Sequence, residues 1–326
     1  MTRIGLILFV SFVAWGGALQ HEPLQRRLDA LARGADGRLG VCVQDARGTS
    51  CLRGEERFSL QSVMKLIVAV AVMDAVDRGS WRLDEQVVVR RQDLSLFVEP
   101  LAKLVTGSGY RTTIGDLVRR AVVDSDSAAV DILIARLGGP IAVQGCLDRL
   151  SVRGVRIDRD ERHLQTEAVG LEWRPEYVDP KVLDLAIERV PKSRHDRAYR
   201  AYQVDVRDTA TPRGMAALLE RLATGKLLSA PSSRHLLEVM QQTVTFPDRL
   251  KAGTAPRWTL GHKTGSSSTW NGVTAATNDV GVLGAPDGGT VAIAVFIGDS
   301  KASSSDKAAL MAKIAAAAIA CYRPDN

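Results

Sequence analysis

The sequence is poor in the features that mark several functional classes. Only 5% of its 326 residues are aromatic, and its net charge of +6 is small for this length. Basic residues are scattered, as at Arg90, Arg91 and within residues 194–200, without the interleaved aromatic residues of a single-strand-binding groove. Charged faces in contact with solvent explain this pattern better. Nucleic acid is therefore not an expected partner.

Cysteine and histidine are also few. The four cysteines form no C-x-x-C pair and do not lie at metal-ligand spacing with any of the five histidines, so a zinc site is not expected. Cys42 and Cys51 flank a predicted turn at residues 45–48, where antiparallel strands would place them opposite each other. We predict a disulfide between them, and buried thiols at Cys146 and Cys321.

A secretory signal is predicted over residues 1–18. Arg3 precedes an apolar run at residues 4–15, and the small residues Gly16, Gly17 and Ala18 follow. The run is too short to cross a bilayer comfortably, so a membrane anchor is the weaker interpretation. The pattern predicts export to the periplasm or the medium, with no membrane anchor after cleavage.

The remaining composition, 45% hydrophobic and 25% charged, is that of a globular protein with two lobes. Patterns typical of strands occur near both ends, and a helical pattern lies between them. We predict an α/β (α+β) fold in which an antiparallel five-stranded sheet is flanked by helices, beside an all-helical lobe. The expected strands are residues 38–43, 49–53, 258–263, 272–283 and 290–297. The expected helices are residues 24–33, 62–78, 112–123, 128–137 and 305–322.

These elements divide the chain into a discontinuous sheet lobe, residues 19–60 and 213–326, and a helical lobe, residues 61–212. The helical lobe contains a long insertion at about residues 166–207. A short helix is predicted there over residues 180–189, with Asp179 as its N-cap.

Three motifs carry the chemistry. Ser62 and Lys65 share one face at the start of a predicted helix, where the amine can lower the cost of deprotonating the hydroxyl. Alone, this S-x-x-K pattern has an alternative interpretation as a helix-capping serine. The two further motifs, at a helix break and on a strand, are Ser125-Asp126-Ser127 and Lys263-Thr264-Gly265 with Ser266 after it.

In this order the motifs resemble those of class A serine β-lactamases and penicillin-binding proteins, across roughly residues 25–322. Residues 159–165 resemble the R-x-E-x-x-L-N stretch of the class A omega loop, and residues 208–212 resemble the segment that closes it. The resemblance implies a serine β-lactamase/transpeptidase-like fold and an ion pair between Arg159 and Asp208.

The similarity is greatest to the extended-spectrum branch, through residues 131–134, 262–265 and 277–281. Two residues depart from the usual pattern nearby. Asp131 stands where most members have Asn, and Asn278 stands where many carry the Arg that binds the substrate carboxylate.

The resemblance also implies a two-step hydrolysis of β-lactams without metal or organic cofactor, by a monomer. Ser62 would be the nucleophile, Lys65 the base, Ser125 the proton relay and Glu161 the deacylating base. Substrate binding is assigned to Ser127, Gln165, Arg249, Lys263, Thr264, Gly265 and Ser266. Of these, Ser127 and Gln165 replace the Asn residues usual in the family.

Three alternatives remain open. A cell-wall D-alanyl-D-alanine peptidase would share Ser62 and both lysines but lack the deacylating carboxylate, and Glu161 argues against it. A class D enzyme would rely on a modified Lys instead. A non-hydrolytic binding protein on the same fold would acylate without turnover. The insertion is predicted to form a flap at the active-site mouth, in which Trp173, Tyr177, Tyr199 and Tyr202 supply apolar cover. The alternative is a surface outgrowth with its own small helix that packs on the helical lobe and does not meet the substrate.

Overall fold

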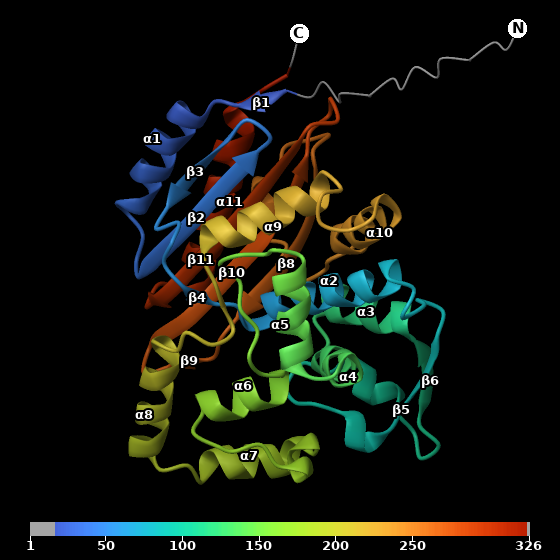
Figure 1. Ribbon diagram of the computed structural model, residues 1–326. Coiled ribbons are helices and arrows are strands. Elements are labelled where there is room, and N and C mark those ends of the chain that lie inside the picture. Colours follow the sequence, from blue (N-terminus) through green and yellow to red (C-terminus); the bar gives the residue numbers. More distant parts are fainter. Residues whose placement is uncertain (1–16, 325–326) are drawn as a thin grey trace, which may run out of the picture.

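The computed structural model describes residues 17–324, so most of the predicted signal lies outside the described residues. Its main sheet is antiparallel, with strand order β3-β2-β11-β10-β8 and a short strand β9 paired to β10. This confirms the predicted sheet and adds β9 to it (Figure 1). The strands of this sheet are β2 Arg38–Asp45, β3 Gly48–Leu52, β8 Thr259–Ser266, β9 Thr269–Trp270, β10 Val273–Gly284 and β11 Thr290–Ser300.

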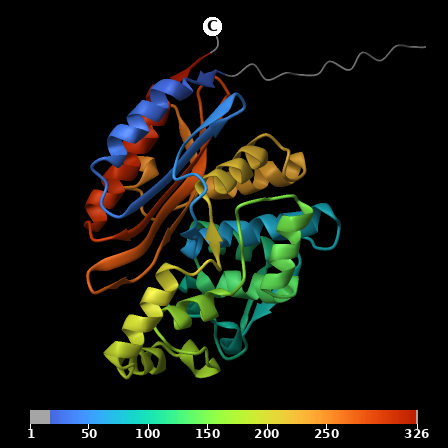
Figure 2. The ribbon, with the colours of Figure 1, turned by 60° about the vertical axis from the view of Figure 1, so that its left-hand side comes forward.

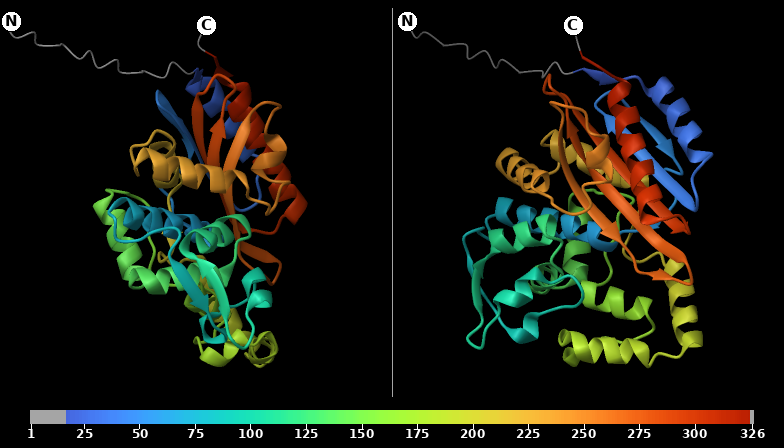
Figure 3. Two further views of the ribbon diagram at one scale, coloured as in Figure 1. Left: turned by 90° about the vertical axis from the view of Figure 1, so that its right-hand side faces the viewer. Right: turned by 180° about the vertical axis from the view of Figure 1, so that it is seen from behind.

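Alternate side chains of the sheet point to opposite sides, and helices cover both of its faces. On β11, Val295 belongs to an apolar cluster that includes Leu24 of α1 and Met311 of α11. Its neighbour Phe296 belongs to the other cluster, with Met215 of α9. Helices α1 (His21–Ala32) and α11 (Ser304–Ala320) therefore cover one face, and α9 (Pro212–Ala223) and α10 (Ala230–Gln241) lie on the other (Figures 2 and 3).

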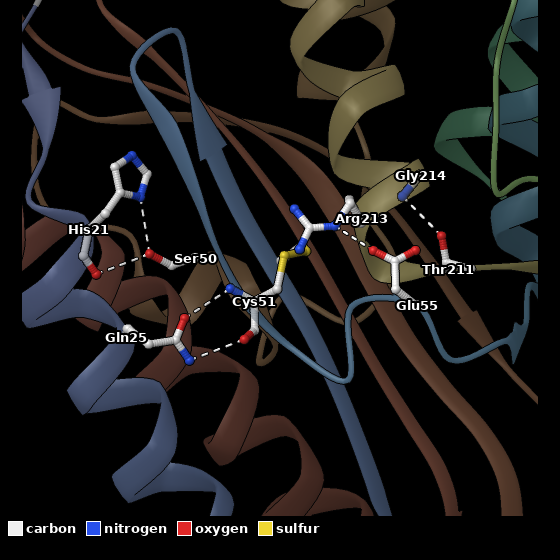
Figure 4. Close-up of a disulfide and its surroundings, with 9 residues drawn as sticks. His21, Gln25, Ser50, Cys51, Glu55, Thr211, Arg213 and Gly214 are labelled. Atoms are coloured by element: carbon white, nitrogen blue, oxygen red, sulfur yellow. Dashed lines mark hydrogen bonds and ion pairs between the residues drawn. A yellow bond between two sulfur atoms is a disulfide. The ribbon is translucent and has the colours of Figure 1, made fainter.

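The predicted disulfide is present. Cys42 and Cys51 are register partners on β2 and β3 and are bonded to each other. The turn between the strands is held by Asp45, whose Oδ1 accepts the backbone N–H groups of residues 47 and 48. Figure 4 shows Gln25 of α1 bonded to the backbone of Cys51 through both ends of its amide. Cys146 and Cys321 are buried free thiols, as predicted.

The helical part is built around α2 (Met64–Asp77). Because α2 is buried on almost every side, it carries apolar residues all round rather than one stripe. The predicted helix at 112–123 begins only at Ile114, since Thr112 and Thr113 belong to strand β6, and Thr113 caps the helix. The other elements here are η1 Gln61–Val63, β5 Gln86–Val89, η2 Arg91–Asp93, η3 Pro100–Leu104, β6 Tyr110–Thr113, α3 Ile114–Val123, α4 Ser127–Leu137, α5 Pro140–Arg149 and α6 Glu161–Ala168.

Two short strands lie where the chain passes between the sheet and the helices. They are β4 (Phe58–Ser59) and β7 (Thr209–Ala210), and they pair antiparallel. We propose that they mark the boundary between the two predicted lobes. The remaining elements are β1 Ala18–Leu19, which pairs with β12 Tyr322–Arg323, and η5 Leu250–Gly253.

Within residues 17–324, no single helix is long and apolar enough to cross a membrane. Helices α4 and α5 reach that length only as a pair, bent by 73°.

The insertion folds into η4 (Pro175–Val178) and two helices, α7 (Pro180–Glu188) and α8 (Lys192–Gln203). Helix α7 confirms the predicted element, and Asp179 is its N-cap, accepting the backbone N–H of Lys181. Helix α8 was not predicted, because its sequence is strongly polar apart from the three residues that it buries, His195, Tyr199 and Tyr202. In Figure 1, α7 lies below α6, and α8 rises beside β9.

Candidate active site

Ser62 lies in η1, the turn that leads into α2, and is partly exposed. The neighbouring strand β8 passes close to this turn at Gly265. A Cβ at that position would meet the carbonyl oxygen of Leu60 at 2.7 Å and the nitrogen of Ser62 at 3.2 Å. Only glycine therefore lets β8 approach the backbone of the predicted nucleophile this closely.

Lys65 is fully buried and points at the S-D-x motif. Its Nζ donates to the carbonyl oxygen of Ser125 at 2.6 Å and to Oγ of Ser127 at 3.1 Å. Ser125 has a φ of 59°, a conformation that costs a non-glycine residue energy. This conformation orients the carbonyl of Ser125 to Lys65 and its hydroxyl to Lys263.

Lys263, on β8, is the second fully buried lysine. Its Nζ donates to Oγ of Ser125 and to the carbonyl oxygen of Thr264, both at 2.9 Å. Burial, and then the nearby Lys65 ammonium, lower the pKa of Lys263 well below its ordinary value. Ser125 thus lies between two amines.

Glu161 is the first residue of α6 and is buried. Its Oε1 is 3.8 Å from Nζ of Lys65 and accepts a hydrogen bond from Nε2 of Gln165 at 3.1 Å. Its other oxygen, Oε2, is buried and accepts no hydrogen bond from the residues described. One oxygen is therefore held by the protein, and the other has no hydrogen-bond partner among the described residues.

Asp131 of α4 holds the backbone at Glu161. Its carboxylate accepts the N–H of Glu161 at 2.8 Å, the N–H of Arg162 at 3.3 Å and the hydroxyl of Ser95 at 2.6 Å. Burial, and then the charge of Asp160, raise the pKa of Asp131 to about 8.

The predicted pair at the base of the loop is present. Nε of Arg159 donates to Asp208 at 2.6 Å, and both side chains are buried. Asp208 also accepts the backbone N–H groups of Asp158 and Arg159, while Glu167 accepts a further bond from the guanidinium. These contacts join the two ends of the segment that contains the insertion.

Arg249 is buried beside the end of β8, with its guanidinium 3.8 Å from the ring centroid of Phe246. It donates to the carbonyl oxygen of Asn278 at 2.9 Å and to Oγ of Ser266 at 2.7 Å. Thr264, two residues before Ser266 on β8, shares a 2.6 Å hydrogen bond with Thr245. Arg249 does not line the cavity described below and reaches its lining through the hydroxyl of Ser266.

A cavity of about 360 Å³ joins many of these residues. Of the predicted site residues, Ser62, Ser127, Glu161, Gln165 and Ser266 line it. Lys65, Ser125 and Lys263 are connected to this lining by the hydrogen bonds given above.

The sequence did not reveal the rest of the lining, which includes Phe97, Ile187, His195 and Trp270. Ile187 and His195 come from the insertion, and the imidazole of His195 stacks on Trp270 with ring centroids 3.6 Å apart. No local sequence pattern marks these residues.

The aromatic residues expected to cover the substrate have other positions. Tyr177 forms a small separate core with Leu96 and Leu183, against which Trp173 packs. Tyr199 and Tyr202 are buried between α8 and the rest of the protein. The insertion borders the cavity through the side chains of Ile187 and His195 instead.

Comparison of the sequence with known proteins identifies the family of this chain. The sequence model of the β-lactamase enzyme family matches residues 23–322. The extended-spectrum β-lactamase PER-1 of Pseudomonas aeruginosa is 28% identical, over 95% of this chain and 90% of its own. The β-lactamase VEB-1 of the same organism is 27% identical, over 96% and 95%.

Solved structures agree. A β-lactamase from Chitinophaga pinensis superposes with a TM-score of 0.74 at 29% identity, covering 90% of this chain and 97% of its own. An ancestral class A β-lactamase gives 0.71 at 29% identity, covering 91% and 99%. The chain therefore belongs to the β-lactamase enzyme family and has the class A fold.

Proposed function

We propose that this protein hydrolyses β-lactams through an acyl-enzyme on Ser62. The observation that carries the proposal is the buried Glu161 carboxylate, which lines the same cavity as Ser62 and lies 3.8 Å from Lys65. A penicillin-binding peptidase has a serine and two lysines but needs no carboxylate to activate water for release of the acyl group. Glu161 therefore favours hydrolysis over a stable acyl-enzyme.

In the first step, the Ser62 hydroxyl loses its proton to Lys65, or to Glu161 through a water, and its oxygen attacks the lactam carbonyl. The backbone N–H groups of Ser62 and Ser266 would stabilise the oxyanion. The ring nitrogen leaves with a proton from Ser125, and Ser125 recovers a proton from the base that deprotonated Ser62, so that Ser125 acts as a relay. Because Lys263 donates to Oγ of Ser125 at 2.9 Å, the Ser125 proton is directed away from Lys263.

In the second step, Glu161 takes a proton from a water molecule that attacks the ester carbon and frees Ser62. Oε2, the oxygen without a partner among the described residues, is the acceptor suited to this proton. Gln165, bonded to Oε1, would orient the carboxylate and the water. We expect the side chain of Ser127, which lines the cavity, to contact the acyl group of the substrate.

The substrate carboxylate is assigned to Lys263, Thr264, Gly265 and Ser266. Arg249 adds a positive charge through the Ser266 hydroxyl, at 2.7 Å. Such a cationic strand end suits an anionic substrate.

We further propose that the protein acts after export, as a monomer. The signal pattern at residues 1–18 supports export, and so does the Cys42–Cys51 disulfide, since such bonds persist in oxidising compartments. The resemblance to class A β-lactamases supports a monomer.

A chromogenic cephalosporin tests the proposal. Steady release of coloured product over many turnovers is expected, with none from Ser62→Ala, which lacks the nucleophile. A single burst equal to the enzyme concentration would instead indicate a penicillin-binding or non-hydrolytic protein. Release of D-alanine from a D-alanyl-D-alanine peptide without β-lactam turnover would identify a peptidase.

A further inference from the structure

A chain of hydrogen bonds connects the insertion to Glu161. Tyr202, near the end of α8, has its hydroxyl 2.7 Å from Oγ of Ser59 and accepts a hydrogen bond from Nε2 of Gln61. Oε1 of Gln61 accepts from Nε2 of Gln165 at 2.8 Å. The same Nε2 donates to Oε1 of Glu161 at 3.1 Å.

The direction of each donor in this chain is set by its two ends. An ionised Glu161 only accepts, so the Gln165 atom beside it is the nitrogen, and Gln61 must then turn its oxygen to Gln165. The nitrogen of Gln61 is left to donate to the hydroxyl oxygen of Tyr202, whose own O–H then donates a hydrogen bond to Oγ of Ser59. Burial raises the pKa of Tyr202 to about 12, so this hydroxyl keeps its proton at neutral pH.

The chain is enclosed. Gln61 is 1% exposed and Tyr202 is 5% exposed, so water does not easily replace a lost partner. Gln61 also has a φ of 47°, which shows that its surroundings hold it in a conformation unusual for its type. Without the Tyr202 hydroxyl, the buried Gln61 nitrogen loses its acceptor, so the Gln61 amide is held less firmly against Gln165. A shift of Gln61 would in turn move the Gln165 nitrogen relative to Glu161.

We propose that Tyr202 is a positioning residue for deacylation, acting on Glu161 through the amides of Gln61 and Gln165. This inference rests on the proposed function, since it concerns the second step of that mechanism. It gives the insertion a role in turnover in addition to any effect on substrate choice.

The test is Tyr202→Phe, which keeps the buried ring and removes only the hydroxyl. If the hydroxyl acts on deacylation, kcat and KM for a penicillin should fall together by about tenfold, the effect of one buried hydrogen bond, while kcat/KM stays constant. Acylated enzyme should accumulate in the intact-protein mass. Tyr199→Phe is the matched control on the same helix, because its hydroxyl contacts the carbonyl oxygens of Ser268 and Val273 and lies outside the chain.

Three results would overturn the inference: an unchanged kcat in Tyr202→Phe, a fall in kcat/KM equal to that in kcat, or the same change in Tyr199→Phe. A second test approaches from the other end of the chain. In a Gln165→Ala background, Tyr202→Phe should have no further effect on deacylation, and additive effects would show an independent action. Failure of the wild-type protein to turn over any β-lactam would instead refute the proposed function.

Discussion

Replacing Asp131 by asparagine should remove a pH-dependent cost from the folded state. The carboxyl is 3% exposed, and burial, followed by the charge of Asp160, raises its pKa from 3.8 to about 8. Asparagine has the shape of the protonated acid. It can accept the N–H of Glu161 through its oxygen and donate to the Ser95 hydroxyl, which now lies 2.6 Å from the carboxylate. It loses the 3.3 Å hydrogen bond from the N–H of Arg162 and the ion pair with the Arg162 guanidinium, so the effect of the carboxyl proton is read from the change of stability with pH.

The sign follows from the raised pKa. The folded protein holds this proton more tightly than the unfolded chain, so the group's contribution to stability is fully present below about pH 4. That contribution is lost as the pH rises toward about 8. Each pH unit within this window changes the free energy of unfolding by about 1.4 kcal/mol. Asp131→Asn does not titrate, so its advantage over the wild type should widen by about 3 kcal/mol between roughly pH 4.5 and pH 7.

Urea unfolding of both proteins at these two pH values gives the difference directly, because groups that titrate alike in both cancel. Asp184→Asn, at an exposed position on α7, is the control and should show no such widening. A difference between wild type and Asp131→Asn that is the same at both pH values would refute the reasoning. It would mean that Asp131 is ionised in the folded state throughout this range.

The remaining predictions concern activity. Glu161→Ala should form the acyl-enzyme but retain it, because no carboxylate activates water. A persistent penicillin adduct is therefore expected in the intact-protein mass. Continued turnover would contradict the role of Glu161. Arg249→Ala should lower kcat/KM about tenfold, because Ser266 loses a charged hydrogen bond of about 1.5 kcal/mol that supports its contact with the substrate carboxylate, and an unchanged value would mean that the Arg249 charge does not act on the substrate. Ile187→Ala and His195→Ala should each alter the ratio of kcat/KM between a bulky cephalosporin and a small penicillin, whereas the exposed Val182→Ala should not. Equal ratios in all three variants would count against a flap that shapes substrate choice.

Local spacing along the chain was enough to predict much of this protein. Alternation of apolar residues identified the strands of the main sheet, and a tight turn placed Cys42 opposite Cys51. The motif residues Ser62 and Lys65 lie within one helical turn, so their proximity follows from helix geometry alone. The predicted Arg159–Asp208 pair, by contrast, came from family resemblance, and the structure contains it.

Tertiary structure decided what surrounds those motifs. Gln61 and Tyr202 are 141 residues apart, and the hydrogen bond between them depends on how α8 packs, which no periodicity encodes. Helix α8 is strongly polar apart from one stripe of buried residues, His195, Tyr199 and Tyr202, and the Tyr199 hydroxyl donates to the carbonyl oxygen of Ser268. The sequence by itself therefore determined the strand segments and the Cys42–Cys51 pair, because these depend on short-range patterns, while the family resemblance supplied the candidate reacting groups. The cavity wall and the hydrogen-bond chain to Glu161 were decided only by folding, because they depend on contacts between distant segments.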